Sequence, residues 1–275
     1  FVAPIMAKWT QAYNQQHPDV KIDYQAIGSG GGIHNLTDKT IQFAGSDAPL
    51  TDDQLKQAGA PVLHLPEVAG PVVMSYNLPQ LNKKLILDGK LIADIFLGTI
   101  TKWNDPQIAA VNPGANLPDL PILVAHRSEG SGTTYIFTGY LAQVSPEWKS
   151  KVGQNVSVSW PTGRGGKGTD GVAAIIKNTA GAIGYVEFAY AMNGHLPVAT
   201  LINKDGKPVD PSIAGVVAAS KAVVDNLPAD FRIPIIDPAG PDAYPISGFT
   251  YLIIYKDLGY LKDKDKALAT VQFIQ

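Results

Sequence analysis

The stretch ILVAHRSEGSGTTYIFTGYL, residues 122–141, points to the expected fold because it contains a strand, a loop and a helix in succession. Residues 122–126 are apolar up to His126 and predict a short buried strand. Residues 127–132 are rich in glycine and serine and predict a tight loop, and residues 133–141 predict a helix. A strand, a short loop and a helix in this order form the repeating unit of α/β proteins.

The same unit recurs on both sides of this stretch. Upstream, residues 20–24 predict a strand, the glycine cluster 28–32 predicts a loop, and residues 33–40 predict a helix. Downstream, the glycine-rich residues 165–171 lead into a predicted helix at residues 172–178. Further helices are predicted at residues 4–17, 52–57 and 89–97, and further strands at residues 43–47, 62–66, 71–76, 182–186 and 251–255. Repeated units of this kind predict two α/β domains that face each other.

The composition of the 275 residues excludes several classes of protein. Hydrophobic residues make up 45%, which is enough for a buried core and excludes a disordered chain. The 22 basic residues against 24 acidic ones give a net charge of −2, and no run of Lys and Arg offers a footprint for nucleic acid. Because there is no cysteine, disulfide scaffolds and thiol catalysis are excluded. No apolar stretch approaches the roughly 18 residues of a membrane span.

Known catalytic and nucleotide-binding motifs fail when they are compared letter by letter. The first glycine cluster has Ile33 where G-x-G-x-x-G needs its last glycine, and Lys167 is followed by glycine where a phosphate loop needs Ser or Thr. Ser131 lacks the outer glycines of a nucleophile elbow, and the five histidines show no metal-binding spacing. We therefore expect no enzyme activity, no metal and no cofactor.

Two of the glycine loops have instead the features of an anion site. Ser29 and the run 131–133 each lie where a loop becomes the start of a helix, where backbone N–H groups are unpaired and the helix dipole favours negative charge. Arg127 stands four residues before Ser131 and could bind a tetrahedral oxyanion through two N–H groups. Ordinary capping by serine would explain either loop alone. The prediction therefore depends on the two loops and the arginine together.

Several motifs resemble those of the periplasmic phosphate-binding proteins of bacterial ABC importers: IGSGGG at residues 27–32, GSDAPL at 45–50, LGTITKWND at 97–105, RSEGSGT at 127–133, GGKG at 165–168 and GAIGYVE at 181–187. The resemblance runs in order along essentially the whole chain. It implies a two-lobed, type II periplasmic-binding-protein fold of α/β class, in which each lobe is a mixed sheet flanked by helices and two crossover hinge strands join the lobes. Lobe 1 is then expected to comprise residues 1–75 and 248–275, and lobe 2 residues 76–247.

The resemblance also implies a set of phosphate contacts in the cleft between the lobes. Hydrogen-bond donors are expected from the N–H of Phe1, the N–H and hydroxyl of Ser29, the charged group of Arg127, the N–H and hydroxyl of Ser131, the N–H of Gly132, and the N–H and hydroxyl of Thr133. Asp47 is expected to accept, and Glu129 to hold Arg127 in place. The sequence differs from the family pattern in two ways. It begins at Phe1, so the threonine that precedes this phenylalanine in the family is either missing or lies before the given residues, and Glu129 stands where Asp is usual.

Asp47 gives the expected site its selectivity. Phosphate near neutral pH keeps a proton and sulfate keeps none, whereas an ionised carboxylate can only accept a hydrogen bond. A site that demands a hydrogen bond rejects an analogue that lacks it by roughly 10⁴–10⁵. Other interpretations are an ordinary turn at residues 46–49, a site for sulfate or molybdate, and a phosphate-ester hydrolase with Ser131 as its nucleophile.

The resemblance further implies that the protein delivers inorganic phosphate to an inner-membrane ABC permease complex. It implies a monomer that is periplasmic, or exported and attached to the cell surface. A secreted phosphate scavenger or adhesin without a transporter is the alternative. Residues 1–9 lack the pattern of a leader, and residues 263–275 start like a helix that has no terminator. We expect further sequence at both ends.

Overall fold

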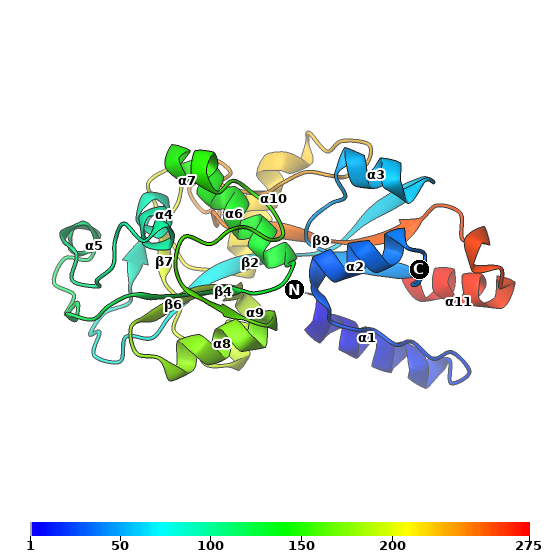
Figure 1. The fold of residues 1–275 in the computed structure, drawn as a ribbon, viewed down its shortest axis with the longest axis horizontal. Helices are drawn as coiled ribbons and strands as arrows, with labels where there is room; N and C mark the ends of the chain where they lie inside the picture. The colour runs from blue at the N-terminus through cyan, green and yellow to red at the C-terminus, as the bar shows by residue number, and fades with distance from the viewer. Residues whose placement is uncertain (1) are drawn as a thin grey trace.

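Strand β2 (Val62–Tyr76) runs through the whole molecule and joins its two parts (Figure 1). The computed structural model describes residues 2–275. From Val62 to Pro71 the strand pairs antiparallel with β9 (Ser247–Tyr255), and from Val72 onwards it pairs antiparallel with β6 (Ala182–Glu187). These pairings place β2 within a six-stranded sheet of order β1-β9-β2-β6-β4-β5.

The sequence predicts two separate strands at residues 62–66 and 71–76, and this division is wrong. The register of β2 against β9 shifts between Pro66 and Val68, so Glu67 forms an irregularity within one continuous strand. An irregularity of this kind accommodates Pro66, which has no N–H to give to the ladder. The pairing with β9 continues on both sides of it.

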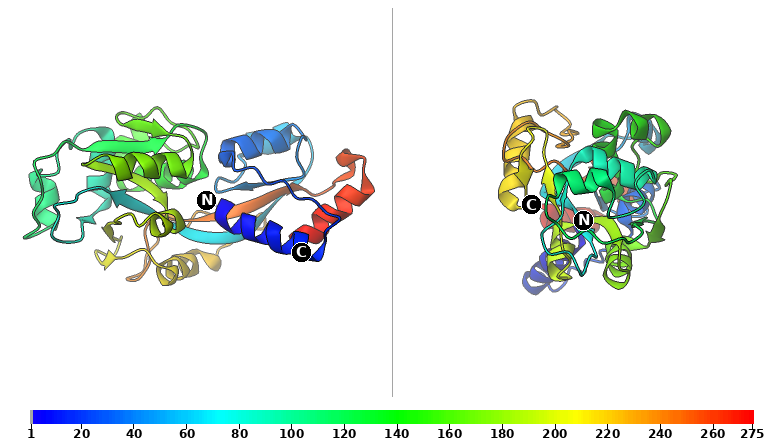
Figure 2. Two further views of the ribbon diagram at one scale, coloured as in Figure 1. Left: turned by 90° about the horizontal axis from the view of Figure 1, so that it is seen from below. Right: turned by 90° about the vertical axis from the view of Figure 1, so that its left-hand side faces the viewer.

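A smaller hydrophobic core lies at the end of the sheet that contains β1 and β9, and we call the part of the molecule around it lobe 1. Its buried side chains are Ile33, Leu36, Ala44, Leu50, Ala58, Tyr251, Ile253 and Tyr255. Besides β9, the elements of lobe 1 are α1 (Ala3–Gln16), α2 (Gly28–Thr37), β1 (Phe43–Ser46), α3 (Asp52–Ala58), the 3₁₀ turn η1 (Gly259–Leu261) and α11 (Lys264–Ile274). Helices α1 and α11 lie side by side (Figure 2), because the ring of Tyr13 packs edge-on against Phe273 with 5.3 Å between centroids.

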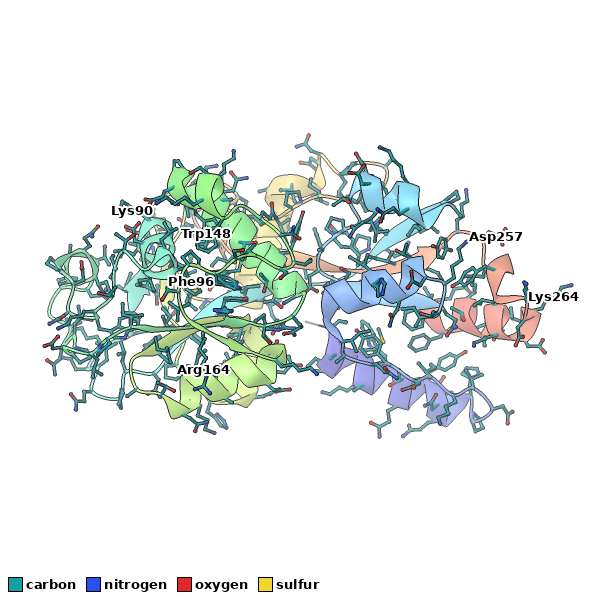
Figure 3. The ribbon with its side chains drawn as sticks, viewed as in Figure 1. Lys90, Phe96, Trp148, Arg164, Asp257 and Lys264 are labelled. Atoms are coloured by element: carbon teal, nitrogen blue, oxygen red, sulfur yellow. The ribbon has the colours of Figure 1, made fainter. Side chains whose placement is uncertain are left out.

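A larger core surrounds the other end of the sheet, in the part that we call lobe 2. Strand β4 (Leu123–Arg127) pairs in parallel with β6 and with β5 (Arg164–Gly166), as expected for strand, loop and helix units. The other elements of lobe 2 are β3 (Ile86–Leu87), α4 (Gly89–Leu97), α5 (Pro106–Val111), α6 (Gly132–Val144), α7 (Pro146–Lys151), α8 (Gly168–Asn178), α9 (Phe188–Asn193), β7 (Thr200–Ile202), β8 (Pro208–Val209) and α10 (Ile213–Val224). Phe96 and Trp148 are fully buried in this core (Figure 3).

Two helices begin earlier than the sequence predicts. Helix α2 begins at Gly28 rather than at residue 33, and α8 begins at Gly168 rather than at residue 172. Both glycines have a positive φ, +78° and +68°, which glycine adopts without steric cost. The glycines that predict loops therefore form the first helical turns, and these turns face the space between the lobes. The strand predicted at residues 20–24 is also wrong, because these residues pair with no strand of the part described.

Candidate anion-binding site

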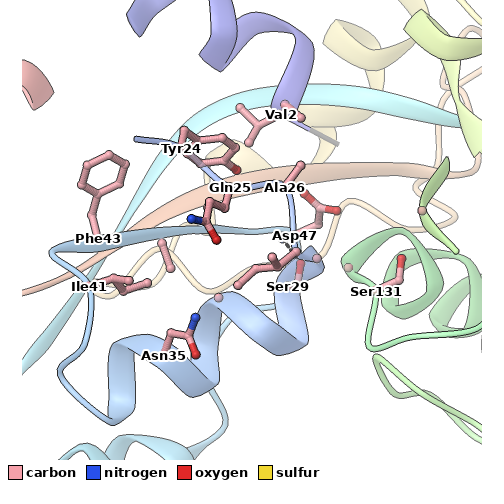
Figure 4. Close-up of a pocket in the computed structure, with 18 of the residues that line it drawn as sticks. Val2, Tyr24, Gln25, Ala26, Ser29, Asn35, Ile41, Phe43, Asp47 and Ser131 are labelled. Carbon is pink, nitrogen blue, oxygen red and sulfur yellow. Dashed lines mark hydrogen bonds between the residues drawn. The ribbon is translucent and has the colours of Figure 1, made fainter. Parts of the chain in front are cut away.

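A cavity of about 440 Å³ lies between the two lobes (Figure 4). Six of the seven predicted contact residues line it: Ser29, Asp47, Arg127, Ser131, Gly132 and Thr133. Phe1, the seventh, lies outside the described residues. Three loops that are far apart in the sequence therefore meet at one place, as the family resemblance implies. Thr169, Asp170, Tyr24 and Tyr190 also contribute to the walls.

Ser29 and Asp47 form the wall that belongs to lobe 1. Ser29 lies in the first turn of α2, and Asp47 follows directly after β1. The backbone N–H of Asp47 donates to Ser29 Oγ at 3.1 Å, and the hydroxyl of Thr250 donates to Asp47 Oδ1 at 2.6 Å. Burial raises the pKa of Asp47, and the hydrogen bond from Thr250 and the charge of Arg127 are among the interactions that oppose this rise. Asp47 is thus a buried carboxyl group with one oxygen held by lobe 1.

The start of α6 forms the opposite wall, in lobe 2. Ser131 is the N-cap of this helix, and its Oγ accepts a hydrogen bond from the N–H of Thr134 at 3.2 Å. Gly132 and Thr133 occupy the first turn, where helix N–H groups have no partner within the helix and the dipole attracts anions. The prediction that the N–H of Ser131 contacts the ligand is not supported, because this group donates to the carbonyl of Val156 at 2.8 Å. Ser131 retains its hydroxyl hydrogen as a donor.

Arg127 lies at the end of β4, and its side chain is held in a fixed position. Its Nε and Nη2 donate to Oε1 of Glu129 at 2.8 and 2.5 Å, and its Nη1 donates to the hydroxyl of Thr169 at 3.2 Å. The side chains of Arg127 and Glu129 are only 8% and 26% exposed, so this is not a solvated surface ion pair. The N–H of Gly168 also donates to Glu129 Oε1, at 3.0 Å. Glu129 therefore pairs with Arg127, and the third glycine loop supports Glu129.

The two lobes touch each other across the cavity through glycines. The N–H of Gly30 in lobe 1 donates to the carbonyl of Gly130 in lobe 2 at 3.2 Å. A Cβ atom added to Gly132 would lie 2.3 Å from Ser29 Oγ and 2.5 Å from Asp47 Oδ2. Only a residue without a side chain allows this approach, so the glycines are required for the closed arrangement of the lobes.

Three polar residues of the site were not identified from the sequence. Thr250 holds Asp47, Thr169 contacts Arg127, and Glu187 at the end of β6 accepts hydrogen bonds from the hydroxyls of Thr133 and Thr169. The sequence does contain a signal for Glu187. This acid ends the apolar strand AIGYVE, and an acid that is buried with such a strand needs a polar partner. Thr250 and Thr169 carry no comparable signal in the sequence.

The arrangement is suited to a small oxyanion. Helix N–H groups, serine hydroxyls and one arginine supply donors, and Asp47 supplies an acceptor among them. Within residues 2–275 no group of three or more His, Cys, Asp or Glu side chains could hold a metal ion. Ser131 Oγ accepts a hydrogen bond from the N–H of Thr134, and this backbone group is not a catalytic base.

Two α/β lobes that enclose a polar cavity between helix N-termini define a class of proteins that bind a small solute between their lobes. Comparison with known proteins agrees, since residues 1–275 match the family model described as PBP superfamily domain. The chain is 44% identical over 257 residues to the phosphate-binding protein PstS of Pasteurella multocida, an alignment that covers 93% of this chain and 74% of that protein. It is 43% identical over 276 residues to the PstS protein of Xylella fastidiosa, covering 100% of this chain and 74% of that one. The chain therefore belongs to the PstS family of phosphate-binding proteins.

Solved structures agree with this assignment at the level of the fold. An ABC-type phosphate transport receptor from Vibrio cholerae matches with a TM-score of 0.60 at 18% identity, covering 99% of this chain and 89% of that one. The two-lobed, type II fold expected from the sequence and the resemblance to phosphate-binding proteins are both confirmed. Among residues 2–275, no helix is both long and apolar enough to cross a membrane.

Proposed function

We propose that the protein binds inorganic phosphate in the cavity between its lobes and delivers it to an ABC importer for phosphate uptake. The observation that carries this proposal is the position of Asp47, a buried acceptor that faces the donors of α6 across the cavity. Family membership supports the same conclusion, because the relatives are named phosphate-binding proteins. The residues that we assign to phosphate contact are Ser29, Asp47, Arg127, Ser131, Gly132 and Thr133, with Phe1 as a further contact and Glu129 in support of Arg127.

The proposal includes the division into lobes and the position of the hinge between them. Lobe 1 comprises residues 1–75 and 248–275, lobe 2 comprises residues 76–247, and the lobes close about the crossovers near residues 73–77 and 246–250. The two separate hydrophobic cores support this division, because each has its own set of buried side chains. Closure brings Ser29 and Asp47 against the start of α6.

We further propose that the protein is a periplasmic or cell-surface monomer whose partner is the permease of the importer, and that it has no enzymatic activity. The hydrolase alternative would use Ser131 as a nucleophile, yet its Oγ accepts a hydrogen bond from the backbone N–H of Thr134, which is not a catalytic base. Incubation with a chromogenic phosphate ester separates the two functions. A binding protein releases no chromophore, whereas steady turnover that is lost in Ser131→Ala would establish the hydrolase.

Titration calorimetry with phosphate tests the proposed function itself. We expect saturable binding with one phosphate per chain, and the loss of most of this binding in Arg127→Met, which removes the charge and the hydrogen bonds of the guanidinium group. A chain that binds no phosphate, or binds it equally well without Arg127, would contradict the proposal.

Affinity for phosphate is expected to depend only weakly on ionic strength. Arg127 is buried and neutralised by Glu129, so the attraction comes mainly from helix and hydroxyl dipoles at short range, which salt screens little. Raising sodium chloride from about 0.05 M to about 0.5 M should weaken binding by less than about threefold. A loss of tenfold or more across this range, measured by calorimetry, would mean that long-range charge attraction dominates.

A further inference from the structure

The chain that follows α10 leaves lobe 2 and reaches the loop of lobe 1 that carries Asp47, next to α3 (Figure 1). We call residues 228–236 the clasp. From the middle of the clasp, Arg232 Nη1 donates to the carbonyl of Leu50 at 2.8 Å and to Asp52 Oδ1 at 3.0 Å. Both partners belong to lobe 1, whereas α10 belongs to lobe 2. A segment that starts in lobe 2 is therefore hydrogen-bonded to the loop beside the site.

The clasp is fixed by further contacts on both sides of Arg232. Asp230 Oδ2 accepts from Arg232 Nε at 2.7 Å, which sets the direction of the guanidinium group. The hydroxyl of Tyr251, on β9 in lobe 1, donates to the carbonyl of Ile233 at 3.1 Å. The chain then turns back, and Ile236 packs against the larger core in lobe 2. The clasp thus crosses to lobe 1 and returns, and it is held there through its backbone as well as through Arg232.

Leu50 is held at both of its backbone polar groups by side chains from distant segments. Its N–H donates to Nε2 of His64, on β2, at 3.0 Å, and its carbonyl accepts from Arg232. Burial, followed by the charge of Arg232, lowers the pKa of His64 to about 4, so the ring is uncharged near neutral pH and Nε2 can accept. The Leu50 side chain is buried in the smaller core. Leu50 can therefore move only if two hydrogen bonds break.

The position of Leu50 constrains Asp47, which stands three residues earlier in the same loop. Pro49 lies between them, and its ring fixes one of the few backbone torsions that join the two residues. A second, smaller cavity of about 90 Å³ is lined by Asp47, by Pro49 and by residues 232–236 of the clasp. The loop has room to shift into this cavity if its anchor is lost. Such a shift would move the Asp47 carboxylate relative to the donors of α6.

We propose that Arg232 is a positioning residue for Asp47, because its bond to the Leu50 carbonyl holds the loop where the carboxylate can accept the hydrogen of the bound oxyanion. This inference rests on the proposed phosphate function and extends it to a residue outside the larger cavity. Doubly charged phosphate has a single hydrogen, and a hydrogen bond weakens steeply when its acceptor is displaced. A displaced Asp47 carboxylate would therefore bind phosphate less well and would repel sulfate less strongly.

Calorimetry with phosphate and sulfate on Arg232→Met tests the proposal. Methionine keeps part of the apolar stem of the side chain and removes its donors. The titrations are made at about pH 8.5, where both anions carry two charges and differ by the hydrogen that Asp47 accepts. Sulfate affinity is measured by competition with phosphate. We expect phosphate to bind about tenfold more weakly and sulfate to bind no more weakly, so the ratio of the two affinities falls by about tenfold or more.

A clasp that only holds the lobes together would give a different result. Closure of the lobes serves every ligand of the cavity, so its loss would weaken phosphate and sulfate by a similar factor. An unchanged ratio in Arg232→Met, with or without a fall of both affinities, would therefore overturn the positioning role. If the wild-type protein binds no phosphate, it is the proposed function that fails.

Asp52→Asn is the matched control, because it removes the ion pair of Arg232 and leaves the bond to the Leu50 carbonyl. The side chains of Arg232 and Asp52 are 24% and 79% exposed, and an ion pair so close to solvent contributes little. We expect this variant to keep the ratio within about threefold of the wild-type value. A ratio that falls as far as in Arg232→Met would show that the ion pair, and not the bond to Leu50, is what matters.

Two conservative pairs of variants keep the test decisive if one protein does not fold. Arg232→Lys can still donate to the Leu50 carbonyl, so its ratio should lie closer to the wild-type value than that of Arg232→Met. His64→Leu removes the other anchor of Leu50 and should also lower the ratio, whereas His64→Gln retains an acceptor for the N–H and should preserve it. If neither Arg232→Met nor His64→Leu lowers the ratio below that of its conservative counterpart, the anchoring of Leu50 does not position Asp47.

Discussion

Replacing Asp47 with asparagine is expected to lower the preference for phosphate over sulfate by a factor on the order of 10³ or more. The ionised carboxylate can only accept, so it bonds to a protonated phosphate oxygen and faces sulfate without any hydrogen between two negative charges. The side-chain amide of the Asp47→Asn variant can donate its N–H to sulfate. Competition calorimetry, with phosphate titrated into protein that holds sulfate, measures the ratio directly.

The matched control for Asp47 is Asp170→Asn. Asp170 also lines the cavity, but it belongs to the first turn of α8 and not to the wall that faces α6. Its replacement should leave the preference for phosphate within about threefold of the wild-type value. An Asp47→Asn variant that keeps its selectivity, or an Asp170→Asn variant that loses as much, would exclude the assigned role of Asp47.

Because the pKa of Asp47 is raised, the preference for phosphate over sulfate should depend on pH. Burial raises this pKa, so the carboxyl group takes up a proton at a higher pH than an exposed aspartate does. Below its pKa the carboxyl group of Asp47 carries a proton and can donate a hydrogen bond to a sulfate oxygen. Sulfate affinity should therefore rise as the pH falls in the wild-type protein and should stay nearly constant in Asp47→Asn. If sulfate affinity rose equally in both proteins as the pH falls, a group other than Asp47 would be responsible for the effect.

Replacing Gly132 with alanine is expected to weaken phosphate binding by about 10–100-fold, because the lobes can no longer close fully. The added Cβ would lie 2.3 Å from Ser29 Oγ and 2.5 Å from Asp47 Oδ2, and both residues belong to the opposite lobe. The isolated helix α6 tolerates alanine well, so the folded state should retain its stability. Small-angle scattering with and without phosphate measures closure, and we expect no compaction on addition of phosphate to the variant.

Gly31→Ala is the control for this steric effect. Gly31 belongs to the glycine cluster of α2, but its Cβ would meet only the flexible side chain of Ile27, in the same lobe, at 3.1 Å. Phosphate affinity and compaction should remain near the wild-type values. If Gly132→Ala closes and binds like the wild type, the observed contact between the lobes is not required for binding.

Some of the residues predicted for the site have chemistry that is visible locally, whereas Phe1, Asp47 and the role of Glu129 were expected only from the family resemblance. Ser29 and Ser131 mark helix starts, and Arg127 with Glu129 two positions later forms a pair that needs no long-range information. These residues do meet in one cavity. The family resemblance, and not their spacing, supplied the expectation that the two loops face each other.

The residues that were missed act through contacts between distant segments. Thr250 reaches Asp47 from β9, and Glu187 reaches Thr133 from β6, so neither contact follows from a local pattern. The helix starts at Gly28 and Gly168 were predicted too late, because intrinsic helix propensity penalises glycine, whereas the positive φ at both positions favours it. At Gly28 the carbonyl of Gly130 in the other lobe also leaves no room for a side chain, since a Cβ atom would lie 2.6 Å from it.

The central claim is that a buried carboxylate, Asp47, selects a protonated oxyanion between the two lobes. Titration of phosphate into the wild-type protein at about pH 8.5, in the presence of a large excess of sulfate, tests it most directly. We predict that sulfate leaves the apparent affinity for phosphate unchanged within about twofold, because the ionised Asp47 rejects it. A strong loss of apparent affinity in proportion to the sulfate added would show that the cavity accepts both anions, and would contradict this account.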